Sequence, residues 1–326
     1  MREEQSSEYE RLREEQETTV TSTLDRPVKV ATFQGVSVRR KITNNLATVL
    51  VTLSVLIALI PLVWVLYAVV TKGFNAVSQA DWFTHSQAGT TAFAVGGGVY
   101  HALIGTLLQG LVCSIISIPI GVMVAVYLVE YGGGTRLGKF TTFMVDILTG
   151  VPSIVAALFI YALWVATFGF QRSGFAVSLA LVLLMIPVIV RATEEMLRIV
   201  PMDLREAAYA LGVPKWKTIV RIVIPTALSG IVTGIMLALA RVMGETAPLL
   251  ILVGYAASIN FDMFGGFMGS LPGMMYDQIA AGAGAGGGNP VPTDRLWGAA
   301  LTLVLLIAVL NIGARFVAKI FAPKKV

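Results

Sequence analysis

Six long apolar runs dominate this chain and decide what it can fold into. A run of about 20 apolar residues is long enough to cross the hydrocarbon core of a membrane. The runs cover residues 46–70, 102–129, 140–167, 173–191, 226–253 and 296–317. Only 13% of the residues are charged, against about 25% in soluble domains, which excludes a soluble globular protein, a disordered chain and a collagen-like fibre. The pattern predicts an all-α integral membrane protein with six transmembrane helices.

Each of the first five runs contains one or more prolines. In a soluble helix an internal proline costs about 3 kcal/mol, but in a membrane bundle neighbouring helices can satisfy the freed backbone groups. The prolines considered are Pro61, Pro119, Pro152, Pro187 and Pro248. We therefore expect kinked spans, while the ends of the short fourth run stay open.

Basic residues between the runs predict the orientation of the spans. Near the runs, seventeen Lys and Arg residues fall on the side of the N-terminal tail and three on the other side; three more lie far back in the tail and Arg241 lies within the fifth run. Because positive residues concentrate on the cytoplasmic side, both termini are expected in the cytoplasm. The polar tail, residues 1–45, is then cytoplasmic and solvated. The same asymmetry accounts for the net charge of +5 without nucleic acid as a partner.

Few residues on this chain suit catalysis or cofactor binding. One cysteine and two histidines are too few for a disulfide framework or a dedicated metal site. The segment Gly133–Lys139 matches the start of a phosphate-binding loop, but Phe140 stands where the magnesium-binding hydroxyl belongs. We therefore expect no enzyme activity and no cofactor here, so that any ATP and Mg are bound by another chain. An intramembrane enzyme and an ATP-independent channel are the competing classes.

The segment between the fourth and fifth runs carries the strongest local pattern. Asp203 and Glu206 are spaced as in a capping box, and Gly212 with Pro214 provides a helix stop. Leu204, Ala207, Ala208 and Leu211 are spaced to share one helix face. Two short helices joined by a glycine turn are predicted, with an apolar surface rimmed by Arg205 and Lys215. A DNA-reading helix pair, a connector on the membrane surface and a docking element for a cytoplasmic partner are the alternatives.

These residues also carry a resemblance to a known family. Glu206-Ala207-Ala208, then Gly212, then Ile224-Pro225 resembles the EAA loop of bacterial ABC-importer permeases, although Ile224 stands where that family usually has Leu. Two more segments, Gly150–Ala156 and Ala240–Leu249, are similar to the PstA permeases of phosphate-specific importers. The likeness covers the chain from about Thr43 onward. The sister PstC permeases and permeases for another oxyanion are the alternatives.

The resemblance implies a function and a set of partners. It implies a permease subunit of an ATP-driven phosphate importer, in a bacterial inner membrane, whose EAA loop is the coupling helix that contacts the ATPase. The implied partners are a second, PstC-like permease, a homodimeric PstB-like ATPase that holds ATP and Mg, an external PstS-like phosphate-binding protein and the lipid bilayer. The implied ATPase contacts are Glu206, Ala207, Ala208, Leu211 and Gly212.

Charged residues at membrane depth are the main candidates for the translocation path or its gate. A helical period places Arg241 and Glu245 on the face of the fifth run that carries Gly230, Gly234 and Ala238. Small residues on that face allow close helix packing, and deep charges face a bundle interior or a wet cavity. Glu245 is expected to pair with Arg241 along the helix, either as a lock or in contact with phosphate.

The other candidates are Thr246, which follows Glu245, and Asp146 in the third run. Asp146 either gates the path or simply reaches the cytoplasmic interface or a basic partner.

Overall fold

The computed structural model describes residues 37–91, 94–283 and 289–321, and every regular element in these ranges is helical. The chain forms two units, residues 1–62 and 63–326, each of which is described by itself. The first unit contains the N-terminal part of helix α2 (Val38–Val77). Because α2 begins at Val38, it includes the last residues of the segment predicted as a polar tail. The rest of that tail, residues 1–36, lies outside the described residues.

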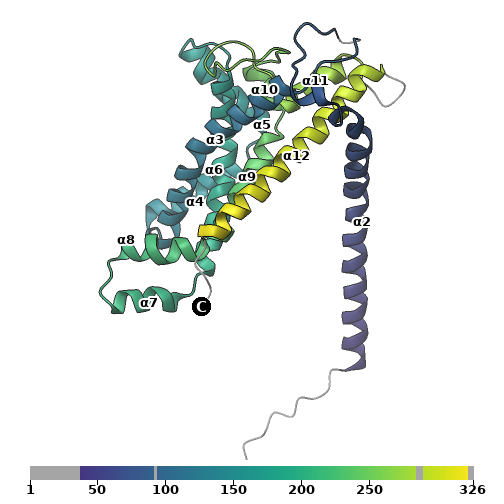
Figure 1. Cartoon of the computed structure of the whole chain (residues 1–326). Coiled ribbons are helices and arrows are strands. Elements are labelled where there is room, and N and C mark those ends of the chain that lie inside the picture. The colour runs from purple at the N-terminus through teal and green to yellow at the C-terminus, as the bar shows by residue number, and fades with distance from the viewer. Residues whose placement is uncertain (1–36, 92–93, 284–288, 322–326) are drawn as a thin grey trace, which may run out of the picture. The chain divides into compact units, whose positions relative to one another are not determined.

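The second unit contains the remainder of α2 and the other helices (Figure 1). These are α3 (Tyr100–Val126), α4 (Arg136–Thr149), α5 (Ser153–Ile160), α6 (Gly174–Ile199), α7 (Met202–Ala210), α8 (Lys215–Thr218), α9 (Ile224–Met243), α10 (Ala247–Leu252), α11 (Leu271–Ala280) and α12 (Pro290–Phe321). Short π-helical turns extend three of the helices: η2 (Tyr127–Tyr131) follows α3, η3 (Tyr161–Thr167) follows α5, and η4 (Ile219–Val223) joins α8 to α9.

Five helical segments of the described chain are long and apolar enough to cross a membrane, or six if the bent pair α4–α5 counts as one span. The predicted all-α, multi-span fold class is therefore confirmed. Figure 1 shows α7 and α8 at one end of the second unit and α10 and α11 at the other. We call these the α7 end and the α11 end.

The kink expected at Pro152 in the run over residues 140–167 is a full break in the structure. The segment is two helices, α4 and α5, bent by 105° at residues 150–152. Pro152 is the N-cap of α5 in an extended conformation. Proline lacks an N–H to continue a helix, and it disfavours helical geometry in the residue before it. The same residue type lies inside unbroken helices at Pro61, Pro119 and Pro187, so composition alone does not tell a break from a kink.

Two other predicted boundaries also differ. The ends of the fourth run, left open at residues 173–191, lie at Gly174 and Ile199 of α6, whose charged residues pair with one another past the apolar run. Glu194 contacts both Arg191 and Arg198. The fifth run was expected to be helical over 226–253, but α9 ends at Met243 and Pro248 opens the separate helix α10.

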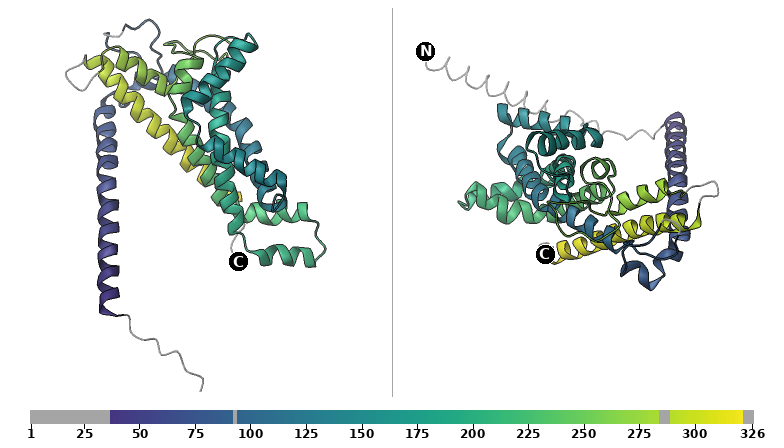
Figure 2. Two further views of the ribbon diagram at one scale, coloured as in Figure 1. Left: turned by 180° about the vertical axis from the view of Figure 1, so that it is seen from behind. Right: turned by 90° about the horizontal axis from the view of Figure 1, so that it is seen from above.

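The core of the second unit forms around α6. Its buried residues, among them Leu181, Met185 and Ile189, pack with side chains of α3, α5, α9 and α10, and Figure 2 shows these helices in one group. Close approach depends on glycine: a Cβ on Gly234 of α9 would lie 2.5 Å from the Cβ of Ala192 on α6. The small-residue face predicted for the fifth run thus packs against α6.

A second apolar cluster, at the α11 end, brings together early and late segments of the chain. Trp82, which is 3% exposed, packs with Leu271, Met274 and Ala299. Its indole nitrogen donates a hydrogen bond to the Thr302 hydroxyl over 2.9 Å. Segments separated by more than 200 residues in the chain therefore share one buried polar contact.

Candidate functional site

The loop between α6 and α9 forms two short helices joined at a glycine, as predicted. Gly212 has a φ of +73°, so a left-handed glycine ends the first helix at the position predicted as its stop. The Gly212 and Val213 amides donate to the carbonyls of Tyr209 and Ala208, so the turn satisfies carbonyls that the helix end leaves free. We call residues 202–218 the α7–α8 loop.

The start of this loop differs from its sequence-based prediction. The expected capping box is not formed, because α7 begins at Met202 with Pro201 as its N-cap and without a side-chain cap. The expected apolar face is also divided. Ala208 is buried, whereas Leu204 and Leu211 are 40% and 83% exposed, and Ala207 and Glu206 are exposed as well. The predicted ATPase contacts thus lie on the surface, except Ala208.

Arg205 holds the loop to the rest of the second unit, which corrects its predicted place at the rim. The side chain is 7% exposed and forms an ion pair with Glu130 of η2, whose side chain is 6% exposed; their nearest N–O distance is 3.0 Å. Arg205 also donates to the carbonyls of Val200 (2.6 Å) and Leu197 (3.0 Å) at the end of α6. Because the guanidinium can donate in several directions, one side chain connects three segments.

Lys215 forms a second contact between the α7–α8 loop and η2. Its amine donates to the Glu130 carbonyl oxygen and lies 4.6 Å from the centre of the Tyr131 ring. Sequence reasoning missed Glu130. The available signal was a lone carboxylate directly after the second apolar run, but its partner lies 75 residues further along the chain.

Asp146 has a basic partner, as one of its two interpretations expected. Its carboxylate contacts Arg191 of α6, which also pairs with Glu194 over 2.8 Å. Glu194 is 5% exposed and contacts Arg198 in turn. The result is a row of four alternating charges that connects α4 to α6.

Arg241 and Glu245 do not form the expected pair. No ion pair joins these two described residues, because α9 ends at Met243 and Gly244 is its C-cap. Beyond a helix end the i, i+4 spacing no longer stacks two side chains. Arg241 is exposed and Glu245 is half-buried. Thr246 is half-buried at the N-cap of α10 and its side chain makes no cap hydrogen bond.

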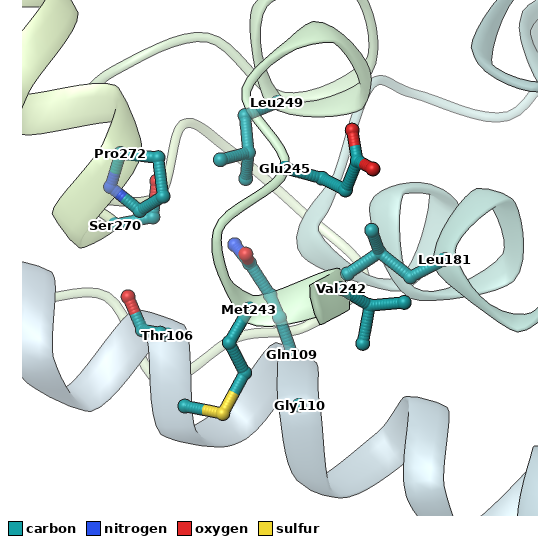
Figure 3. A pocket seen from close by; sticks show the side chains of 10 residues that line it. All are labelled: Thr106, Gln109, Gly110, Leu181, Val242, Met243, Glu245, Leu249, Ser270 and Pro272. Carbon is teal, nitrogen blue, oxygen red and sulfur yellow. The ribbon is translucent and has the colours of Figure 1, made fainter. Parts of the chain in front are cut away.

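Glu245 lines a small internal cavity that sequence reasoning missed (Figure 3). The cavity measures about 10 Å³, which is room for about one water molecule. Figure 3 shows the Gln109 amide pointing into it from α3, opposite Ser270 and Leu249. Gln109 is 3% exposed, and its Nε2 has no hydrogen-bond partner within the described part of the chain. An uncharged amide such as Gln109 inside an apolar run does not indicate, from sequence alone, that it lines a cavity.

Comparison with known proteins agrees with this architecture. Residues 117–326 match the family model described as binding-protein-dependent transport system inner membrane component. A chain of the MetNI methionine ABC transporter in an inward-facing conformation has a similar fold, with a TM-score of 0.53 and 20% identity. The match covers 69% of this chain and 95% of that one.

Closer relatives carry a more specific name. The phosphate transport system permease protein PstA of Mycobacterium leprae is 59% identical over 90% of this chain and 95% of its own. PstA 1 of Mycobacterium tuberculosis is 57% identical over 90% and 94%, and PstA of Pasteurella multocida is 40% identical over 88% and 96%. The chain belongs to the binding-protein-dependent transport permeases and, among them, to the PstA family of phosphate transport permeases.

Proposed function

We propose that this permease is one of two membrane-spanning subunits of an ATP-driven phosphate importer in a bacterial inner membrane. Its proposed partners are a PstC-like permease, a homodimeric PstB-like ATPase and an external PstS-like phosphate-binding protein. ATP and Mg are bound and used on the ATPase. The observation that carries the proposal is the α7–α8 loop, which presents exposed apolar side chains and is fixed at its base by buried Arg205 and Glu130.

This arrangement suits a loop that transmits force to and from another protein. Leu204, Tyr209 and Leu211 are 40%, 41% and 83% exposed, and apolar anchors of this kind fit a groove in a partner. Glu206, Ala207 and Gly212 complete the proposed contact. A connector lying on the membrane surface needs no buried ion pair at its base, and so the docking function is the better account.

We propose that Arg241 faces the wet path between the two permeases. Arg241 lies two residues before the end of α9 and is exposed, and an arginine within a spanning helix is costly unless it faces a bundle interior or a wet cavity. A path toward the second permease supplies water and the transported anion. Guanidinium geometry suits phosphate oxygens through two parallel hydrogen bonds. Glu245 and Thr246, at the break between α9 and α10, belong to the same proposed path, while Asp146 supports it by tying α4 to Arg191.

Reconstitution tests the function directly. The permease is combined with its candidate partners in lipid vesicles, and uptake of phosphate and of sulfate is measured with and without ATP. ATP-dependent uptake of phosphate over sulfate is expected. Uptake that proceeds without the ATPase would instead identify an ATP-independent channel.

The orientation is tested by labelling single cysteines. Both termini are proposed to be cytoplasmic, so the α7 end faces the cytoplasm and the α11 end faces outward. In a Cys113→Ala background, cysteines replace exposed Ala88, Ser258 and Ala210 one at a time. A membrane-impermeant thiol reagent applied to whole cells should label positions 88 and 258, and label position 210 only after permeabilisation. Labelling of position 210 in intact cells contradicts the orientation.

Gly212→Val tests the shape of the docking surface. A residue with a Cβ costs about 1–2 kcal/mol in the left-handed conformation that Gly212 adopts, so the turn is expected to rearrange. We expect association with the ATPase to weaken about tenfold, with uptake reduced accordingly. Gly133→Val is the matched control, because Gly133 is a loop glycine without a positive φ and with open space around it. Equal behaviour of the two variants removes the argument for docking.

A further inference from the structure

We propose that a pocket beneath the α7–α8 loop binds a phosphate group, separately from the transport path. The pocket has a volume of about 380 Å³ and lies between the ends of α3, α6 and α7. Its polar lining consists of Glu130, Arg198, Arg205, Tyr209 and Lys215. The phosphate group is carried either by an anionic lipid or by free inorganic phosphate.

The charges around this pocket do not cancel. Three cations and one carboxylate line it. The Glu130 carboxylate is paired with Arg205. The other two cations of the lining are Arg198 and Lys215. Arg198 contacts Glu194 through one nitrogen, but Glu194 also pairs with Arg191, and the Arg198 side chain is 67% exposed. The amine of Lys215 donates to a backbone carbonyl, which carries no full charge. Asp146 and Glu194 together balance Arg191 and Arg198, so Lys215 is the cation of the lining that lacks a carboxylate in the described structure. Arg198 keeps N–H donors that its contact with Glu194 does not use.

The chemistry of these side chains favours a phosphate group. Arginine binds phosphate oxygens through two parallel hydrogen bonds, and lysine supplies a point charge. Tyr209 also lines the pocket, and its side chain carries a hydroxyl donor. The volume falls in the range of pockets that hold small molecules, so a phosphate with part of a lipid head group fits as well as a free phosphate. Basic pockets between membrane helices are typical sites for phospholipid head groups.

Occupancy of this pocket affects the α7–α8 loop. Arg198 belongs to α6 and Lys215 to α8, so a phosphate group that contacts both bridges the fixed bundle and the second half of the loop. That bridge acts beside the Arg205–Glu130 ion pair and limits movement of the loop. The loop thereby responds to the lipid composition of the membrane or to the phosphate level on its own side.

Native mass spectrometry of the full-length permease in detergent tests the site. The probes are phosphatidylglycerol, phosphatidylcholine and inorganic phosphate. Each basic residue contributes about fivefold to the binding of a phosphate group near the membrane surface. We expect Arg198→Gln and Lys215→Gln each to weaken binding about fivefold, and the double variant about thirtyfold. Lys217→Gln is the matched control, since Lys217 lies on the same short helix but does not line the pocket.

Competition between phosphatidylglycerol and inorganic phosphate shows whether a lipid or a free phosphate supplies the bound group. Selective retention of phosphatidylglycerol over phosphatidylcholine, undisturbed by inorganic phosphate, identifies the lipid. Saturable binding of inorganic phosphate that survives Arg241→Gln with Glu245→Gln identifies free phosphate at this pocket rather than in the transport path. The charge-conserving pair Arg198→Lys with Lys215→Arg should keep binding, which separates lost charge from misfolding. Absence of both kinds of binding, or binding unchanged in the double variant, overturns the proposal.

Discussion

Glu130→Gln is expected to abolish most ATP-dependent phosphate uptake while the spans remain inserted. The carboxylate is buried against Arg205, and removing one partner of a buried ion pair costs about 3–5 kcal/mol. The charge of Arg205 is then buried without a counterion, and its hydrogen bonds to the carbonyls of Leu197 and Val200 do not offset that cost. The expected result is an α7 that detaches from the end of α6, so that the loop no longer presents a fixed surface to the ATPase.

Three measurements separate this effect from general misfolding. Purified variant should lose its ATPase partner during affinity purification and be cleaved faster by trypsin after Lys215 and Lys217. Glu195→Gln is the matched control, because Glu195 is an exposed carboxylate on neighbouring α6, and it should behave as wild type. Replacing both Glu130 and Arg205 by methionine removes the unpaired charge and should restore part of the stability. A Glu130→Gln permease that keeps normal uptake shows that the ion pair is dispensable.

Arg241→Gln with Glu245→Gln is expected to stop phosphate movement without disturbing assembly. The double change removes one positive and one negative charge, so the net charge of the path is kept. Since no ion pair joins these side chains in the described structure, a role as a mutual lock is not what holds α9 in place. Loss of a charge-assisted hydrogen bond costs about 1.5–3 kcal/mol, which corresponds to a fall in uptake of roughly tenfold to a hundredfold.

The measurement is uptake by vesicles that contain the assembled transporter, normalised to the amount of bound ATPase. Arg221→Gln serves as the control, because Arg221 is an exposed arginine of η4 at the α7 end. It should leave uptake near the wild-type level. Near-normal uptake by a well-assembled Arg241 and Glu245 double variant removes Arg241 from the translocation path.

The helices themselves could be predicted from sequence because about 20 apolar residues have few alternatives to a membrane helix. Their ends could not. The helix α6 continues past its apolar run, where Glu194 pairs with Arg191 and Arg198. The helical spacing of these residues allows the pairs, but hydropathy alone does not carry the helix to Ile199. Pro152 breaks a helix where Pro119 and Pro187 do not, since the difference depends on the neighbours of each proline.

In the α7–α8 loop, too, features set by the local sequence could be predicted, and features set by distant residues could not. The left-handed Gly212 was predictable because the conformation is set by the turn itself. The burial of Arg205 was not, because an arginine on an amphipathic helix is read as facing water. It is buried because the end of α6 offers free carbonyls and Glu130 offers a charge, and both lie outside the local pattern. Likewise, Gly244 separates Arg241 from Glu245 in space although their spacing suits a pair.

The hydrogen bond from Trp82 to Thr302 bears on how the permease is made. A ribosome synthesises the chain from the N-terminus, so Trp82 enters the membrane region long before Thr302 exists. Until α12 is inserted, the indole lacks both its hydrogen-bond partner and the apolar contact of Ala299. The nascent protein therefore passes through a stage in which the segment around Trp82 is not yet packed against α12. A chain truncated before α12 leaves the apolar surface around Trp82 uncovered, and this surface is then open to the proteases and chaperones of the cell.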